Sequence, residues 1–277
     1  MAATTSATLD DLFANIIAQA RFTAEQQSLM LGLVTPYNIG STPGKTIQIP
    51  KYPSIAASAL VEGTDMSSTT VSTSSVTVTI AEVGAQVLLT DLARDGHGNP
   101  AIELGTVLGS AIAKKMDQDL LALFDGFSTS LGGAGTEITV ADIFKAVAIL
   151  QNNNAPGSMA AVIHPYTAYQ LKANLTNTFA NPNGGDAQNE AMRSSFVGSL
   201  GGVDIYQSSN LTVDGNDDVK GAVFSREALA IALKRDFQIE TQRDASLRAT
   251  ELNATAVYGV GELDDTYGVE LFFDAAV

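Results

Sequence analysis

Two short segments of alternating residues constrain the fold of this chain more than any other feature. The first alternates polar and apolar side chains over residues 45–49, and the second does so over residues 75–80. Alternation of this kind is typical of extended strands with one buried face. The stretch 52–70 between them holds small residues together with Pro53 and Gly63, so it cannot form a core of its own. The sequence therefore predicts a long β-hairpin with a loose tip.

The apolar face of this hairpin needs a cover. A two-stranded ribbon is only marginally stable in water until a third strand or another surface packs against it. The apolar side chains of the two alternating segments are Ile47, Ile49, Val76, Val78 and Ile80. We therefore expect a surface outside the hairpin to complete it.

The remaining sequence predicts a mixture of helices and strands. An amphipathic helix near the N-terminus carries Leu12, Phe13 and Ile16 on its apolar face. Apolar residues recur at helical intervals over 100–124, and Thr139 with Asp142 forms a capping pair for a further helix. The polar segment 176–200 is expected to be a loop. A helix is also expected over 165–175, and strands over 159–163, 203–207, 222–224, 237–241, 255–260 and 268–273.

Composition excludes several classes of protein. The 277 residues include no cysteine and no tryptophan, which excludes disulfides, thiolate nucleophiles and zinc–thiolate sites. Thirty acidic and 15 basic residues give a net charge of −15, so we expect no tight binding of nucleic acid. The longest apolar run, 228–233, is too short to span a membrane, and the N-terminus lacks the basic start of a secretory signal. We therefore expect no membrane association and no export.

No residue pattern predicts a catalytic, cofactor-binding or metal site. His164 lies at a strand end before a proline, where a structural role is expected. The segment 40–46 is one residue short of a phosphate-binding loop and leads into a strand. The acidic turn 214–218 lacks the spacing of a calcium loop. The two glycines of 259–261 lack the third glycine of a dinucleotide fingerprint and indicate a strand bend.

The order of these parts carries more information than any single motif. It runs from an amphipathic arm through a long hairpin, a long helix and a mixed α/β region to acidic closing strands. Four local sequence segments also contribute to this pattern: 161–169, 198–211, 221–243 and 258–273. This arrangement resembles the major capsid proteins of tailed bacteriophages with the HK97 fold. The resemblance spans nearly the whole chain.

The resemblance implies an α+β fold of the HK97 type with five segments. They are an N-terminal arm (1–41), an E-loop hairpin (42–87), a P domain with a spine helix (88–138), an α/β A domain (139–235) and C-terminal strands that return to the P domain (236–277). It also implies that E-loops lie over neighbouring subunits, which would supply the missing cover. The interface residues expected in the arm and E-loop are Leu12, Phe13, Ile16, Ile47, Ile49, Lys51, Tyr52, Val76, Val78 and Ile80.

The function that this resemblance implies is structural, without enzymatic activity or cofactors. Copies of the chain would form hexamers and pentamers of an icosahedral shell around the double-stranded DNA of a tailed phage. Expected partners are other copies, a portal, and scaffolding or cement proteins where these are used. The chain would be made in the bacterial cytoplasm and reside in the virion. Lys45 and Lys51 lie near the E-loop, but we expect no crosslink between subunits.

Two alternatives remain open from the sequence. An encapsulin-like bacterial compartment would use the same fold to hold a cargo protein instead of DNA. A soluble α/β ligand-binding protein is favoured only by the strand and helix predicted over 159–175.

Overall fold

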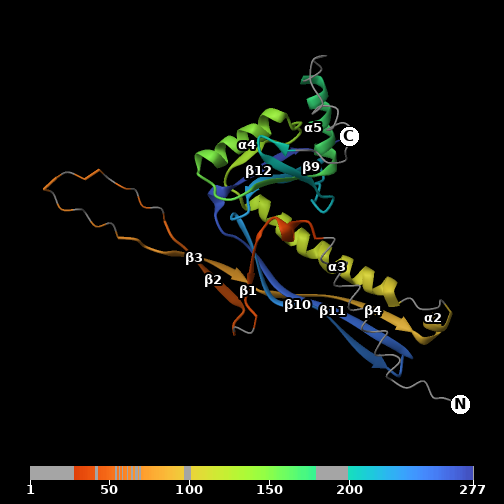
Figure 1. The fold of residues 1–277 in the computed structure, drawn as a ribbon. Helices are drawn as coiled ribbons and strands as arrows, with labels where there is room; N and C mark the ends of the chain where they lie inside the picture. Colours follow the sequence, from red (N-terminus) through yellow and green to blue (C-terminus); the bar gives the residue numbers. More distant parts are fainter. Residues whose placement is uncertain are drawn as a thin grey trace.

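Three β-sheets organise the part of the chain that the computed structural model describes. This part comprises residues 28–40, 43–53, 71–96, 101–178 and 199–276, with scattered residues between 54 and 70. One sheet has four strands, one has six and one is a two-stranded ribbon. In Figure 1 the ribbon projects to one side, the four-stranded sheet runs to the other, and the six-stranded sheet lies above them with its helices.

The four-stranded sheet is built on a long antiparallel hairpin. In sheet order its strands are β1 (Thr35–Asn38), β10 (Leu229–Asp244), β11 (Ala249–Glu262) and β4 (Ala81–Thr90). Helix α3 (Ala101–Leu121) lies along this sheet, because Leu108, Ile112 and Leu120 recur at helical spacing and are buried in the same core as the sheet. The helix predicted over 100–124 is confirmed over 101–121, and the 3-10 turn η2 (Ala122–Gly126) follows it.

The six-stranded sheet forms a second hydrophobic core. In sheet order its strands are β5 (Ser130–Gly132), β12 (Gly268–Asp274), β9 (Asp218–Ser225), β6 (Met159–Ile163), β8 (Val203–Gln207) and β7 (Ser199–Leu200). Helices α4 (Val140–Asn152) and α5 (Pro165–Thr178) contribute Ile143, Leu150 and Leu171 to this core. The predicted capping box is present at the start of α4, where Asp142 accepts hydrogen bonds from the Thr139 backbone N–H and hydroxyl.

The predicted pair of alternating strands is confirmed as a ribbon. Its strands are β2 (Thr46–Lys51) and β3 (Ser74–Thr79), which are antiparallel. Thr46 lies opposite Thr79 at one end of the pairing, and Lys51 lies opposite Ser74 at the other. Beyond that second end the chain continues as the tip of the ribbon, away from both larger sheets (Figure 1). The remaining elements are short: η1 (Met30–Gly32), α2 (Asp91–Gly96) and η3 (Asp265–Tyr267).

Strand pairing departs from the predicted segment boundaries. β4 follows β3 after one residue, yet it pairs with β11 instead of prolonging the ribbon. The predicted boundaries at 87/88 and 235/236 therefore fall inside β4 and β10. The sequence also predicts that the strands after 236 return to the region of the long helix. β11 does so, since Leu252 and Tyr258 share a core with α3, but β12 lies between β9 and β5 in the six-stranded sheet. The reason is that Val269, Leu271 and Phe273 on β12 belong to the core formed with α4 and α5.

Two predictions concern residues outside the described part of the chain. These are the N-terminal amphipathic helix, with Leu12, Phe13 and Ile16, and most of the loop expected over 176–200. Among the described helices, none has both the length and the apolar character needed to cross a membrane.

Candidate assembly interface

The ribbon has one apolar and one polar face. Ile47 lies directly opposite Val78, and Ile49 lies opposite Val76. Directly opposed residues of an antiparallel pair point to the same side, and so do residues two apart on one strand. These four side chains therefore share one face, while Thr46, Gln48 and Thr77 occupy the other and are exposed.

The base of the apolar face is covered by the chain itself. Val78 is 1% exposed and Ile80 is 8% exposed. Val78 sits against Gly259 and Gly261 of β11, since a Cβ added at Gly261 would lie 2.7 Å from the Val78 Cγ2. Val78 and Ile80 are therefore covered by their own chain, and their predicted contact with another subunit stays a prediction. The cover is intramolecular because β3 crosses β11 before the chain enters β4.

The end of β2 is also attached to the body of the molecule. The Lys51 Nζ lies 2.5 Å from the Asp264 Oδ2. Burial opposes ionisation of Asp264, but hydrogen bonds from Lys51 and from Thr266 outweigh it, so the pKa of Asp264 lies below its ordinary value. The Lys51 charge is engaged within the chain while 45% of its side chain stays exposed, and its predicted contact with another subunit stays a prediction.

The outer part of the ribbon presents apolar side chains to solvent. Ile47, Ile49 and Val76 are only half-buried. Tyr52 at the start of the tip is 69% exposed, and Leu60, in the middle of the segment 52–70, is 66% exposed. Ile55 and Val71 are also exposed in this segment. Full burial of such a side chain contributes about 1.5–3 kcal/mol, so a surface that covers several of them would bind the tip favourably.

Sequence reasoning predicted Tyr52 but missed Ile55, Leu60 and Val71. Their signal was weak because each stands alone among small and polar residues, with no periodicity to mark a face. The detectable feature is that bulky apolar residues recur in a segment that cannot bury them itself.

Among the described residues, no cluster of three histidine or acidic side chains has the geometry to hold a metal ion. The His164 Nδ1 accepts a hydrogen bond from the Tyr166 backbone N–H at the start of α5, and burial lowers the His164 pKa. A surface depression of about 250 Å³ is lined by Asp125 and Lys220 among others, but these two groups form an ion pair with each other. His164 and Lys220 thus have structural partners.

Comparison with known families decides the class of this protein. Residues 73–270, more than half of the chain, match the family described as phage capsid protein. The chain belongs to this family. The resemblance expected from the order of the sequence elements is thereby confirmed.

Individual relatives agree with the family assignment. This capsid protein is 25% identical over 234 residues to the major capsid protein of Staphylococcus phage phiMR11, covering 83% of this chain and 81% of that protein. The capsid structure of Cyanophage P-SCSP1u is similar with a TM-score of 0.69 and 20% identity, over 88% of this chain and 87% of that chain. The holo-SrpI encapsulin complex of Synechococcus elongatus is similar with a TM-score of 0.64 and 11% identity, over 90% and 88% of the two chains. At these identities the two structures show a shared fold.

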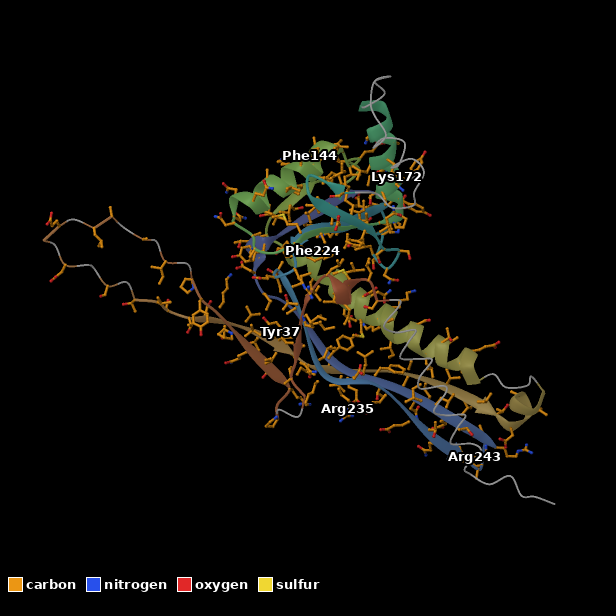
Figure 2. All side chains as sticks on the ribbon, in the orientation of Figure 1. Tyr37, Phe144, Lys172, Phe224, Arg235 and Arg243 are labelled. Carbon is orange, nitrogen blue, oxygen red and sulfur yellow. The ribbon has the colours of Figure 1, made fainter. Side chains whose placement is uncertain are left out.

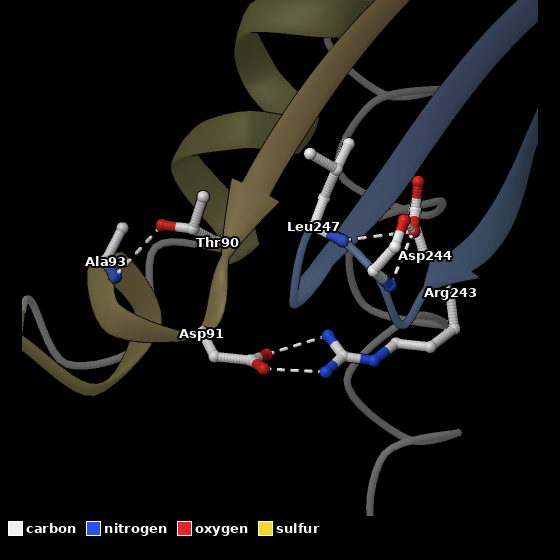
Figure 3. Close-up of polar contacts among 7 residues, drawn as sticks. Thr90, Asp91, Ala93, Arg243, Asp244 and Leu247 are labelled. Atoms are coloured by element: carbon white, nitrogen blue, oxygen red, sulfur yellow. Dashed lines mark hydrogen bonds and ion pairs between the residues drawn. The ribbon is translucent and has the colours of Figure 1, made fainter.

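The capsid protein exposes a second apolar group at the far end of its four-stranded sheet. Here Leu92 on α2 and Leu247 in the β10–β11 turn are exposed. Figure 3 shows that Arg243 joins this turn to Asp91 through two hydrogen bonds of 2.8 and 2.6 Å. Asp244 accepts hydrogen bonds from Ser246 and from the Leu247 backbone N–H, which lower the Asp244 pKa. The turn is therefore held in one conformation with Leu247 outside.

A buried carboxylate fixes the place where the N-terminal part of the capsid protein joins α3. Asp117 is almost fully buried and accepts a 2.8 Å hydrogen bond from the Ser28 hydroxyl. It also accepts hydrogen bonds of 3.1 Å from the backbone N–H groups of Leu29 and Met30. Ser28, Leu29 and Met30 are therefore held beside α3.

Proposed function

We propose that this chain is the major capsid protein of a tailed phage and that its copies assemble into an icosahedral shell around double-stranded DNA. The observation that carries the proposal is the projecting ribbon tip, where Tyr52, Ile55 and Leu60 stay exposed among the residues that the structure describes. Contact with a neighbouring subunit would remove these side chains from water. The ribbon thus has the role of the E-loop.

The remaining parts have corresponding roles in this proposal. The four-stranded sheet with α3 serves as the P domain with its spine helix, and the six-stranded sheet with α4 and α5 serves as the A domain. Subunits associate as hexamers and pentamers, with a portal at one position and with scaffolding or cement proteins where the phage uses them. The shell is made in the bacterial cytoplasm and persists in the virion.

The charge of the chain fits a DNA container. With a net charge of −15, the protein offers little attraction for the phosphate backbone. A wall that does not hold the packed DNA leaves it free to move during filling and ejection. In the part of the chain that the structure describes, no cluster of histidine or acidic side chains could hold a metal ion.

An encapsulin-like compartment is the second candidate, favoured by the similarity to the SrpI encapsulin complex. The two functions differ in the contents of the shell. Particles purified from cells that carry the natural gene cluster would contain nuclease-sensitive DNA after disruption in the first case and a cargo protein in the second. A ligand-binding protein without a shell is disfavoured by the family match.

Deleting residues 52–70 and closing the ribbon with a short Gly-Ser turn tests the proposed role of the tip. We expect the circular dichroism spectrum and thermal unfolding of the remaining chain to be preserved, because both cores lie outside the deletion. Negative-stain electron microscopy and sedimentation should show loss of closed shells. Alanine at Ser68 and Thr70 provides a control in the same segment and should assemble normally. Closed shells of normal size from the deletion variant would contradict the proposal.

A further inference from the structure

The two glycines of 259–261, whose spacing predicts a strand bend, lie where the ribbon meets the four-stranded sheet. Both lie on β11, next to Tyr258, which belongs to the core beneath α3. Alternation along the strand places Gly259 and Gly261 on the opposite face of the sheet. On that face a Cβ at Gly259 would lie 2.4 Å from the Thr79 carbonyl oxygen, and one at Gly261 would lie 2.7 Å from the Val78 Cγ2.

The two glycines therefore form a seat for the ribbon. Contacts below 3.0 Å are not available to a real side chain, so a residue larger than glycine at 259 would displace the ribbon backbone at Thr79, and one at 261 would displace the Val78 side chain. Neither glycine has a positive φ angle, so the backbone of β11 does not itself require glycine here. The requirement comes from the close approach of β3.

The ion pair of Lys51 with Asp264 is a second attachment on the other strand of the ribbon. Lys51 lies opposite Ser74, and Ile47 lies opposite Val78, so the two attachments are four residues apart along the strands. At about 3.4 Å per residue this separation is roughly 14 Å. A ribbon held at two separated points, one on each strand, resists both tilting and rotation.

The charges around Lys51 favour this attachment. Asp264 faces the ammonium directly, and Glu262 and Asp265 lie close enough to influence the same site electrostatically. Lys51 is thus the cation among three carboxylates at the junction of β11 and η3. A partly exposed ion pair contributes little to overall stability, so its effect falls on the position of the ribbon.

We propose that the Gly259–Gly261 seat and the Lys51–Asp264 ion pair act together as a two-point anchor that sets the direction in which the ribbon leaves the body for a neighbouring copy of this chain. The four residues are positioning residues for assembly. Their use in assembly rests on the proposed function, whereas the anchor itself is a property of a single chain.

Distance measurement by electron spin resonance tests the anchor directly. The chain has no cysteine, so Thr77→Cys on β3 and Lys114→Cys on α3 provide two unique labelling sites, and both positions are exposed. Labelled full-length protein is mixed with an excess of unlabelled protein, which restricts the signal to distances within one chain. We expect one narrow distance distribution for the doubly labelled parent.

Three variants of the labelled protein decide the outcome. Lys51→Met and Gly261→Ala should each broaden or shift the distribution, because each removes one attachment. Val78→Ala combined with Gly261→Ala should restore it, because the smaller side chain makes room for the added methyl group. Lys45→Met removes an exposed lysine of the same ribbon and should leave the distribution unchanged. A broad distribution in the parent, or parent-like distributions in both single variants, would overturn the anchor.

Assembly of the same proteins without labels supplies the functional readout. We expect Lys51→Met and Gly261→Ala to reduce the fraction of closed shells at least several-fold, with recovery in the Val78→Ala and Gly261→Ala double variant. If displaced ribbons still produced parent-like shells, the proposed role in assembly would be wrong. If the parent formed no shells, the proposed function would fail, while the distance distributions would still decide whether the anchor exists.

Discussion

The ribbon and the six-stranded unit place their apolar residues in opposite ways. In the six-stranded unit, Ile143, Leu150 and Phe273 are almost completely buried within one chain. In the ribbon, only the base is covered, and the tip leaves Tyr52, Ile55 and Leu60 in solvent. Figure 2 labels two phenylalanines of the body, of which Phe224 is buried and Phe144 on α4 is exposed. The six-stranded unit therefore buries its apolar side chains within one chain, whereas those of the ribbon tip stay exposed in the single chain.

The largest expected effect on the free energy of unfolding comes from a comparison of leucine-to-alanine substitutions in the six-stranded unit and in the ribbon tip. Leu150→Ala should lower the free energy of unfolding by about 2–5 kcal/mol, because it leaves a cavity in the six-stranded unit. Leu60→Ala should change the free energy of unfolding by less than about 0.5 kcal/mol, because Leu60 is exposed in the single chain. Urea denaturation of the dispersed protein measures both values.

Leu60→Ala, which should have the smaller effect on stability, should have a clear effect on assembly. Leu60→Ala removes apolar area from the proposed contact, so the protein concentration needed for shell formation should rise. Light scattering over a concentration series measures this threshold. A large loss of stability from Leu60→Ala would show that the tip is packed on its own chain, and the contrast between the two regions would be broken.

An intermediate effect is expected at Asp117, which joins the N-terminal part to the body. Asp117→Asn replaces one of the two acceptor oxygens with a donor, although Ser28, Leu29 and Met30 all donate to this side chain. A buried backbone N–H without an acceptor costs about 1–3 kcal/mol. Hydrogen exchange should therefore accelerate around η1 and β1 while α4 and β6 stay protected.

A matched control is Asp204→Asn on the exposed side of β8, which should change neither region. If Asp117→Asn accelerated exchange equally in η1 and in the six-stranded unit, Asp117 would support the whole body instead of one junction. The N-terminal junction and the six-stranded unit would then unfold as one cooperative region.

Local patterns were sufficient to predict the longer elements of both regions, but not the short strands β5 and β7. The apolar spacing along α3, the Thr139–Asp142 capping box and the alternation of β2 and β3 each depend on neighbours in sequence. Such signals are independent of where an element is placed in the fold. The helices and strands that these signals predict are therefore present in the structure, with small differences in where each element begins and ends.

Placement was not predictable, because it depends on distant residues. No turn residue stands between Thr79 and Ala81. The sequence therefore does not reveal that β3 pairs with β2 whereas the next strand, β4, pairs with β11. The burial of Val78 likewise depends on missing side chains at Gly259 and Gly261. These glycines were read as a strand bend, because the strand that approaches them lies far away in sequence.

The smallest expected effect is a pH dependence at the junction between the two regions. Burial raises the pKa of Glu262 above its ordinary value of 4.5, and the charges of Asp265 and Asp264 add to this effect while Lys51 opposes it. A carboxyl with a raised pKa in the folded state stabilises the fold fully below its unfolded pKa and loses that contribution as the pH rises through the folded pKa. Glu262→Gln should therefore raise stability near neutral pH by less than about 1 kcal/mol and have almost no effect near pH 4.

Urea denaturation of Glu262→Gln at both pH values measures this difference, and Glu240→Gln on the exposed side of β10 is the control. Equal changes at the two pH values would mean that packing, not ionisation, distinguishes glutamine from glutamate at this site. A gain confined to neutral pH would instead show that the wild-type chain tolerates an unfavourable carboxylate beside Asp264. Removing that charge leaves Asp264 as the acidic partner of Lys51, so the spin-label distance of this variant should stay close to that of the parent. The ion pair on the ribbon and the titration of Glu262 can thus be separated experimentally.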